Sequence, residues 1–482
     1  MTEPSTREFA VETHHVDPVP ATERSGRARD MFSLWFSANL NVGNAVFGLV
    51  ILSVVPDFWL ALAATLIGNV IGTALMALHS VQGARLGIPQ LIQSRGQFGY
   101  FGALVPVAAA ALMYLGFTVS VTIVGGQALA AATGMELRAA MLIVALASLV
   151  IAVVGYHAIH TVCRWAQLPL TIVVLVVTCA ALLHRGAPLT THQPVSIGAF
   201  LTGVGVAVTF ALTYAPFVSD YSRYLPVETS GRAIFGWTAA GVFVSASWVC
   251  LIGLLLTAKF GESDIFRSAD VALGGGALST AVLLVTAAGL VITNVLNVYG
   301  GMLNLITGLA TFKRVTVSFR TRVLMILPTF VVGTAAATVA YQNYAENLGA
   351  FLSLLLLVLI PWGAVNLVDY YLVQHGNYDV PAMYAKAGPY WHDPSNWVYR
   401  GLNVRVLIAY FAGVLAGFPF VSSAWFQGPL SEWLGGADVS WIPGLVVTAA
   451  VYLVLARLTR GDESARLRPS TSNSPTEQGL QR

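Results

Sequence analysis

Apolar residues in this chain form long stretches between residues 32 and 458, and no lysine or arginine lies in the interior of any of them. Because a charged side chain at the centre of a bilayer costs at least about 2.5 kcal/mol, this distribution is typical of membrane-crossing helices. A crossing helix needs about 20 apolar residues. The pattern therefore predicts an all-α membrane protein with twelve transmembrane helices, at 32–55, 58–80, 100–133, 138–156, 165–183, 197–219, 233–257, 275–310, 322–341, 347–372, 403–423 and 440–458.

The basic residues give the spans an orientation. With the N-terminus inside, Arg138, Arg185, Lys259 and Arg267 fall on the outer side, and the other 21 of the 25 fall on the inner side. Cytoplasmic loops carry such an excess of lysine and arginine. We therefore expect a multi-pass protein of the plasma membrane with both termini in the cytoplasm.

The two ends of the chain differ from the rest in composition. Residues 1–30 are polar and lack the apolar core of a signal peptide, and residues 461–482 are rich in serine, proline, threonine and arginine. We expect both tails to be disordered. The twelve spans then form one transporter domain at 31–460.

Composition argues against several function classes. The chain has 482 residues, 56% hydrophobic and 10% charged, with a net charge of +3, which does not favour nucleic acid as a partner. Cys163, Cys179 and Cys250 show no metal-binding spacing, and no glycine-rich run ends in the GK[ST] of an ATP-binding loop. No nucleophile–base pair or metal ligand set is apparent. We expect no enzymatic activity and no cofactor.

Charged groups are scarce in the spans, and those near the inner ends have simple explanations. We expect His79, His157 and His160 to be solvated at the interface, and Asp220 to pair with Arg223 or Arg232.

Amides, small residues and aromatic rings cluster in spans 1, 3, 6 and 8. Small residues and amides also serve ordinary helix packing, and one such cluster would be read in that way. Spans 1 and 6, however, are each interrupted midway, at 41–44 and at Pro216, and they occupy matching places in two five-span halves. Paired broken helices point to a transport site, because their free backbone groups must face a ligand, an ion or water.

The pocket between these spans carries no fixed charge, so the sequence predicts a neutral, planar, hydrogen-bonding substrate. Aromatic rings would stack on it, and amides and hydroxyls would bind its edge. A nucleobase fits better than a sugar or an amino acid, although helix N-termini alone could hold an amino-acid carboxylate. The candidate substrate-binding residues are Phe36, Phe117, Gln127, Phe210, Thr213, Tyr214, Asn294 and Asn297.

Several motifs resemble the purine–cytosine permeases of the nucleobase–cation symport family 1. They are DYSRYLP at 220–226, NVGN at 41–44, IVGGQ at 123–127 and NLVDYY at 366–371, with GNYDV at 376–380 and GLN at 401–403 in further agreement. The resemblance implies the leucine-transporter-like fold, with two inverted five-helix repeats at 31–184 and 197–373 and two extra spans at 402–459. It also implies import by alternating access, coupled to a cation.

The resemblance also implies roles for single residues. Phe117 and Tyr214 stand where the family usually has tryptophan, and they would sandwich the ring. In sodium-coupled relatives span 8 offers two adjacent hydroxyls to the ion, whereas this chain has Ile292-Thr293, which favours a proton over sodium. If a metal binds at all, we expect sodium only. The candidate cation-binding residues are Asn39, Gly43, Gly289 and Thr293.

Two other functions stay open on the sequence alone. The same pocket could take another neutral heterocycle, such as hydantoin, allantoin or a vitamin-like pyridine. The fold could also serve a membrane sensor that transports nothing.

Overall fold

The computed structural model describes residues 16–154, 156–184, 186–189, 194–261, 264–313, 315 and 318–466. Helices make up almost all of the regular structure in these residues. The α-helices are α1 (Asp30–Asn39), α2 (Val46–Val54), α3 (Phe58–Leu86), α4 (Gln90–Phe98), α5 (Leu104–Thr133), α6 (Leu137–Val154), α7 (Tyr156–Leu183), α8 (Ile197–Leu212), α9 (Val218–Ser222), α10 (Gly231–Phe260), α11 (Ile265–Leu273), α12 (Gly276–Ala310), α13 (Phe319–Ala340), α14 (Tyr344–Val368), α15 (Val404–Gly417), α16 (Pro429–Trp433) and α17 (Trp441–Arg466).

Short irregular elements join these helices. A π-helical turn continues α14 at Asp369–Val373, and one small antiparallel hairpin pairs β1 (Val398–Tyr399) with β2 (Leu402–Asn403). The 3-10 turns lie at Ala21–Glu23, Val42–Ala45, Ala215–Phe217, Pro381–Tyr384, Pro394–Asn396 and Phe418–Phe420.

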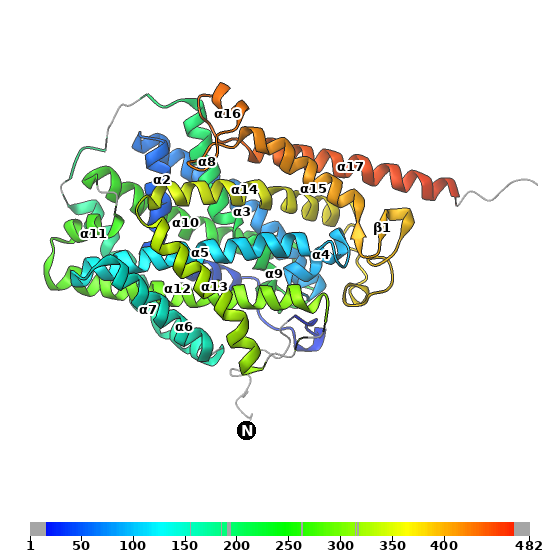
Figure 1. Ribbon diagram of the computed structural model, residues 1–482, viewed down its shortest axis with the longest axis horizontal. Coiled ribbons are helices and arrows are strands. Elements are labelled where there is room, and N and C mark those ends of the chain that lie inside the picture. Colours follow the sequence, from blue (N-terminus) through cyan, green and yellow to red (C-terminus); the bar gives the residue numbers. More distant parts are fainter. Residues whose placement is uncertain are drawn as a thin grey trace, which may run out of the picture.

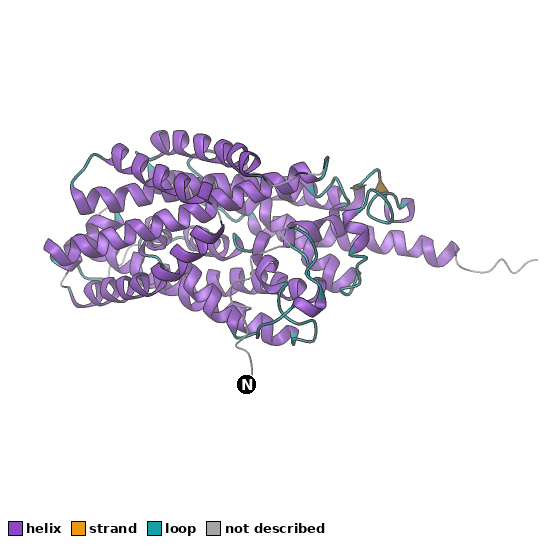
Figure 2. Cartoon of the chain, turned by 90° about the horizontal axis from the view of Figure 1, so that it is seen from below, coloured by secondary structure: helices purple, strands orange, loops and turns teal. Residues whose placement is uncertain are grey.

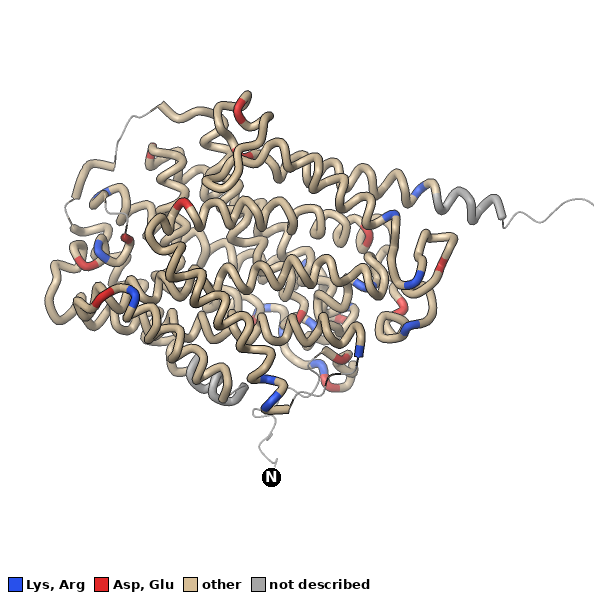
Figure 3. The backbone as a smooth tube through the Cα atoms, in the orientation of Figure 1, with Lys and Arg blue, Asp and Glu red and all other residues tan. Residues whose placement is uncertain are grey.

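Many of the long helices pack side by side along the long axis of the molecule (Figure 1). Figure 2 shows the same bundle from below. Helix α5 packs on α12, α3 on α8 and α10, and α15 on α17. In Figure 3 the long helices in the middle of the bundle carry few charged residues, as expected if they face lipid.

Within the described residues, ten helices are long and apolar enough to cross a membrane, and the bent pair α1 and α2 makes an eleventh span if it is counted as one. All eleven coincide with predicted spans. The remaining predicted span, 403–423, corresponds to the apolar helix Val404–Phe420, which falls below the length of a full crossing. The structure therefore supports a protein with ten or eleven spans by length.

Span 1 is broken where the sequence predicts it. Helices α1 and α2 meet at an angle of 72°. Asn41 adopts an extended conformation between them, and its side-chain oxygen accepts a hydrogen bond from the backbone N–H of Gly43. Asn44 donates through its side chain to the carbonyl of Asn39, at 3.1 Å. Two asparagine side chains thus bond backbone groups that the missing helical turn leaves free.

Span 6 is interrupted more gently. Helix α8 ends at Leu212, and a 3-10 turn at Ala215–Phe217 with Pro216 in its first turn leads into α9. Proline has no N–H to donate and cannot continue the hydrogen-bond ladder. The residues Ile197–Ser222 nevertheless form one candidate membrane span, without a sharp bend like the one between α1 and α2.

The molecule has two polar ends, which we call the N-terminal face and the far face. The N-terminal face contains the start of α1 and the end of α3, which the Arg24 guanidinium joins to the N-terminal segment by donating to the Ala84 carbonyl at 3.0 Å. The far face contains the start of α8 and the loop before α17, joined by a bond of 2.9 Å from the Asp438 N–H to the Thr202 hydroxyl.

Parts of both tails are ordered in the described residues, although the sequence predicts disorder there. Residues 16–29 pack on the N-terminal face, with Val19 buried and its N–H bonded to the Gly87 carbonyl at 2.9 Å. Helix α17 continues to Arg466, six residues past the predicted boundary at 460. Residues 1–15 and 467–482 lie outside the described residues.

Candidate functional site

Asn39 lies at the break in span 1 and joins three elements. Its side-chain N–H₂ donates to the Ser245 hydroxyl on α10 at 3.1 Å and to the Trp35 carbonyl at 3.2 Å. Its side-chain oxygen accepts a hydrogen bond of 2.5 Å from the phenol of Tyr214, at the interruption of span 6. Asn39 is fully buried. The two interrupted spans therefore meet through a neutral amide and a phenol.

Tyr214 and three other aromatic rings gather at this contact. We call the four rings the aromatic cluster: Trp35, Tyr114, Tyr214 and Phe217. Tyr214 packs against Trp35 at a ring-centroid distance of 5.5 Å and edge-on against Phe217 at 5.8 Å. Tyr114 of α5 stacks on Phe217 at 6.0 Å. Flat apolar faces with polar edges can hold a planar ring by stacking.

Two buried polar atoms near the break have no hydrogen-bond partner among the described residues: the indole Nε1 of Trp35 and the side-chain Oδ1 of Asn294. The Asn294 side chain is held in place because its N–H₂ donates to the Thr122 hydroxyl at 3.1 Å. A donor and an acceptor left unpaired in a buried site cost free energy until something bonds them. They are therefore suited to read the edge of a neutral ligand.

Three of the four predicted cation ligands, Gly43, Gly289 and Thr293, form a second group on the side of the break that faces α12, whereas Asn39 bonds Tyr214. Asn41 donates through its side-chain N–H₂ to the Thr293 hydroxyl at 3.3 Å, and that hydroxyl donates to the Gly289 carbonyl at 3.0 Å. An amide donor thus points at the oxygen that would have to ligate a cation. No group of three or more histidine, cysteine or acidic residues within the described ranges could hold a metal ion.

Gly43 and Gly289 contribute space to this group. A side-chain carbon at Gly43 would collide with Leu290, and one at Gly289 with Leu170 of α7. Their absent side chains let α12 approach both the break and α7 closely.

Phe210 and Thr213 lie with the aromatic cluster. Phe210 is buried, stacks on Phe47 of α2 at 4.0 Å and is tilted against Tyr214 at 6.2 Å. The Thr213 hydroxyl bonds back to the Phe210 carbonyl at 2.7 Å. Phe210 therefore connects the interruption of span 6 to the far half of span 1, and Thr213 bonds within span 6.

Phe36, Phe117, Gln127 and Asn297 lie at half-buried positions. Phe36 stacks on Phe32 at 5.5 Å and contacts Trp248 of α10, and Phe117 packs edge-on against Phe351 of α14 at 5.6 Å. Across the described residues, no hydrogen bond joins Gln127 or Asn297 to Tyr214 or Asn294. The rings that pack on Tyr214 are thus those of Trp35, Phe210 and Phe217, while Phe117 packs on α14.

The sequence interpretation left Trp35, Tyr114, Phe217 and Asn41 out of the site. Asn41 begins the predicted break at 41–44, Trp35 lies on the helix before it, and Tyr114 lies one turn before Phe117 on the same helix. Their closeness to the break was the available signal. Phe217 directly follows Pro216, and only the path of the 3-10 turn turns its ring towards Tyr114.

One expectation for the N-terminal face needs correction. His79 is fully buried and stacks on Trp362 at 5.1 Å rather than being solvated. Asp220 accepts the backbone N–H of Gln90 at 2.9 Å at the start of α4, and Arg223 donates to the backbone carbonyl of Asp220, so the pairing of the Asp220 side chain with Arg223 or Arg232 stays a prediction. The side chains of His157 and His160 lie outside the described residues.

Comparison with known proteins places the chain in a family. Residues 18–444 match the model of permeases for cytosine/purines, uracil, thiamine and allantoin. The chain is 33% identical over 450 residues to YxlA of Bacillus subtilis (strain 168), named as a candidate purine–cytosine permease, covering 93% of this chain and 96% of that one. It is 24% identical over 477 residues to the purine–cytosine permease fcyB of Emericella nidulans, covering 93% and 89%.

Two solved structures share the fold. The chain aligns with Mhp1, a nucleobase-cation-symport-1 family transporter in a closed conformation with bromovinylhydantoin bound, with a TM-score of 0.70 and 20% identity, covering 94% of this chain and 96% of that one. The inward-facing conformation of Mhp1 gives a TM-score of 0.72 at 19% identity, covering 92% and 93%. Together with the family match and its many apolar helices, this similarity establishes the chain as a multi-pass membrane protein of the nucleobase–cation symport family 1.

Proposed function

We propose that the chain is a secondary active importer of a neutral nucleobase, such as cytosine or a purine, and that it works by alternating access. The supporting observation is the break in span 1, where the neutral Asn39 amide meets Tyr214. Backbone groups of the interrupted helix and aromatic faces gather there, and among the described residues no charged side chain takes part in the hydrogen bonds around Asn39. Such a site suits an uncharged, flat, hydrogen-bonding ligand.

The aromatic cluster would stack on the ring, and the free atoms Trp35 Nε1 and Asn294 Oδ1 would bind its edge. A nucleobase carries both acceptors and donors around its rim, so it can satisfy an indole N–H and an amide oxygen together. Phe117, Gln127, Thr213 and Asn297 remain candidates for contacts in a more open conformation. A ligand without the matching groups would leave buried polar atoms unpaired, which is how such sites discriminate.

We propose a proton rather than sodium as the coupling cation. The Asn41 amide donates to Thr293, and Ile292 supplies no second hydroxyl. A sodium ion there would have to displace a hydrogen-bond donor. We further propose that the N-terminal face is cytoplasmic, in keeping with the excess of basic residues in its loops.

Uptake into proteoliposomes tests this function. Radiolabelled cytosine, adenine and hypoxanthine are offered under an inwardly directed proton gradient, a sodium gradient or neither. We expect uptake of at least one base with the proton gradient alone, competed by the other bases and not by sugars or amino acids. A chain that moves none of them under any gradient does not have the proposed function.

A further inference from the structure

The carboxyl group of Asp438 is buried at the far face. Asp438 lies in the loop between α16 and α17, and only 3% of the residue is exposed. Its N–H donates to Thr202 of α8, and its Oδ1 accepts the Ser440 N–H at 3.1 Å. Its other oxygen, Oδ2, has no hydrogen-bond partner within the described ranges. An ionised carboxylate in that position would keep part of its charge unsolvated, which is costly.

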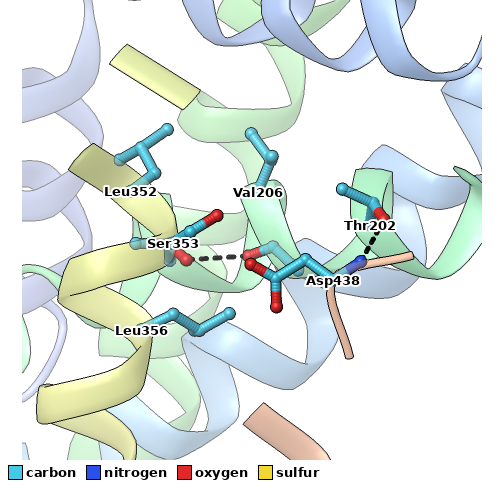
Figure 4. A pocket seen from close by; sticks show the side chains of 8 residues that line it. Thr202, Val206, Leu352, Ser353, Leu356 and Asp438 are labelled. Carbon is cyan, nitrogen blue, oxygen red and sulfur yellow. Dashed lines mark hydrogen bonds between the residues drawn. The ribbon is translucent and has the colours of Figure 1, made fainter. Parts of the chain in front are cut away.

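Figure 4 shows a small cavity beside this carboxyl group. It measures about 10 Å³, close to the space that one water molecule needs. Its walls come from α8, α14 and the Asp438 loop, and they include Thr202, Gly205, Thr209 and Ser353. Two further buried polar atoms without partners among the described residues, Ser440 Oγ and Trp441 Nε1, belong to the same stretch of chain.

The absent side chain of Gly205 keeps this cavity open. A carbon added there would lie 3.5 Å from Leu356 and 3.5 Å from the Trp441 ring, which is ordinary contact rather than a clash. An alanine therefore fits at this position and would occupy space beside the cavity. Helix α8 does not need glycine here for its own packing.

Among the described residues that line the cavity, Asp438 alone carries a charged side chain. On the elements packed around it, Glu346 at the start of α14 and Glu432 on α16 are exposed to solvent. Burial raises the pKa of Asp438, and the nearby hydroxyl and N–H groups of Ser353, Ser440 and Ser422, with the Ser353 hydroxyl first among them, oppose this only in part. The neutral acid is therefore favoured as long as the loop stays packed on α8 and α14.

We propose that Asp438 is a proton-binding site that holds the far-face ends of α8 and α14 against the α16–α17 loop while it is protonated. The bound proton comes from solvent and forms an O–H bond at Oδ2, which then has a donor to offer to Ser353 or to one water in the cavity. When the proton leaves, the carboxylate needs more water than the cavity holds, and the helices separate. The role in transport rests on the proposed function, whereas proton binding does not.

The sign of the pH effect follows from the two conformations. The packed conformation binds the proton more tightly than an open, hydrated one, so the packed fraction falls as pH rises through the raised pKa. Helix α8 carries Phe210 and leads directly into Tyr214. Opening of its far end would therefore give the aromatic cluster a route to the far side.

Cysteine accessibility in proteoliposomes tests the proposal with the full-length chain. The three native cysteines are replaced by alanine, and Val206→Cys places one thiol in the cavity wall. Its rate of modification by a small thiosulfonate reagent is measured from pH 5 to pH 8, with Asp438 or with Asp438→Asn. The ratio of the two rates removes the titration of the thiol itself. We expect this ratio to rise by about tenfold for each unit of pKa difference between the two conformations.

Two further variants and a sodium titration at constant pH decide the outcome. Glu346→Gln, an exposed acid on α14, should leave the pH profile unchanged, and Gly205→Ala should shift its midpoint to higher pH because it takes space from water. A ratio that stays flat with pH overturns the proposal. A ratio that follows sodium concentration at constant pH also overturns it, in favour of a sodium site. Because no substrate is needed, the result stands apart from any failure of cytosine uptake.

Discussion

The phenol of Tyr214 donates a hydrogen bond of 2.5 Å to the side-chain oxygen of Asn39, and this bond joins the interrupted parts of spans 1 and 6. Both groups are neutral. The side-chain N–H₂ of Asn39 donates to the Trp35 carbonyl and the Ser245 hydroxyl. The hydrogen bond to its side-chain oxygen comes from Tyr214. The contact fixes how the two broken spans face one another.

Tyr214→Phe should weaken this contact without changing the ring. The Asn39 oxygen would remain buried without a donor, which costs about 1–3 kcal/mol. We expect a lower melting temperature in detergent and a loss of most cytosine uptake. Tyr410→Phe is the matched control, because it removes a hydrogen bond of 3.2 Å to the Val358 carbonyl far along the chain from either break. Equal uptake by the two variants would remove Tyr214 from the site.

Asn41→Asp should create a sodium response. It keeps the side-chain oxygen that caps Gly43 and replaces the N–H₂ group facing Thr293 with an anionic oxygen. We expect sodium to raise the melting temperature of this variant and to leave the unmodified chain unchanged. Asn44→Asp, which alters the neighbouring amide, is the control. Sodium stabilisation of the unmodified chain would contradict proton coupling.

Gly253→Ala should destabilise the packing of α10 on α2. An added carbon would collide with the backbone carbonyl of Ala45, and backbone cannot move aside as a side chain can. Overpacking of this kind costs about 1–3 kcal/mol or more. Gly236→Ala on the same helix meets nothing within 4 Å and should be neutral or slightly stabilising. Thermal unfolding of both variants in detergent measures the difference, and equal melting temperatures would contradict the close approach.

Asp369→Asn should loosen the attachment of α17 to α14. The two carboxylate oxygens accept hydrogen bonds of 2.5 Å from the phenols of Tyr452 and Tyr378. An amide would turn a donor towards one of these phenols, and a buried mismatch of this kind costs about 1–3 kcal/mol. Asp379→Asn, at an exposed position ten residues on, is the control. Proteolysis of the segment between α14 and α15 should speed up in the first variant only.

The span boundaries could be predicted because lipid imposes a simple pattern. The second span begins at residue 58 in both the prediction and the structure, where Asp57 caps α3. It ends six residues later than predicted, since helices continue past the apolar stretch until a residue such as Gly87, with a φ of 70°, stops them. Helices α4 and α11 were missed because nine-residue segments between the long spans leave no strong apolar signal.

The break in span 1 was predictable from Asn41 and Gly43, but the ring contacts were not. Tyr114 and Phe117 lie three residues apart on α5, so their directions around the helix differ by only about 60°. Sequence alone does not say which of them faces span 6. In the structure Tyr114 contacts Phe217 and Phe117 contacts Phe351, so the two rings pack on different elements.

An electron cryomicroscopy map of the full chain with a transported base bound tests the central claim most directly. We expect density for the base stacked on the aromatic cluster, with its edge bonded to Trp35 Nε1 and Asn294 Oδ1. Density for the base elsewhere in the bundle, or a map in which span 1 runs unbroken through Asn41, would contradict it.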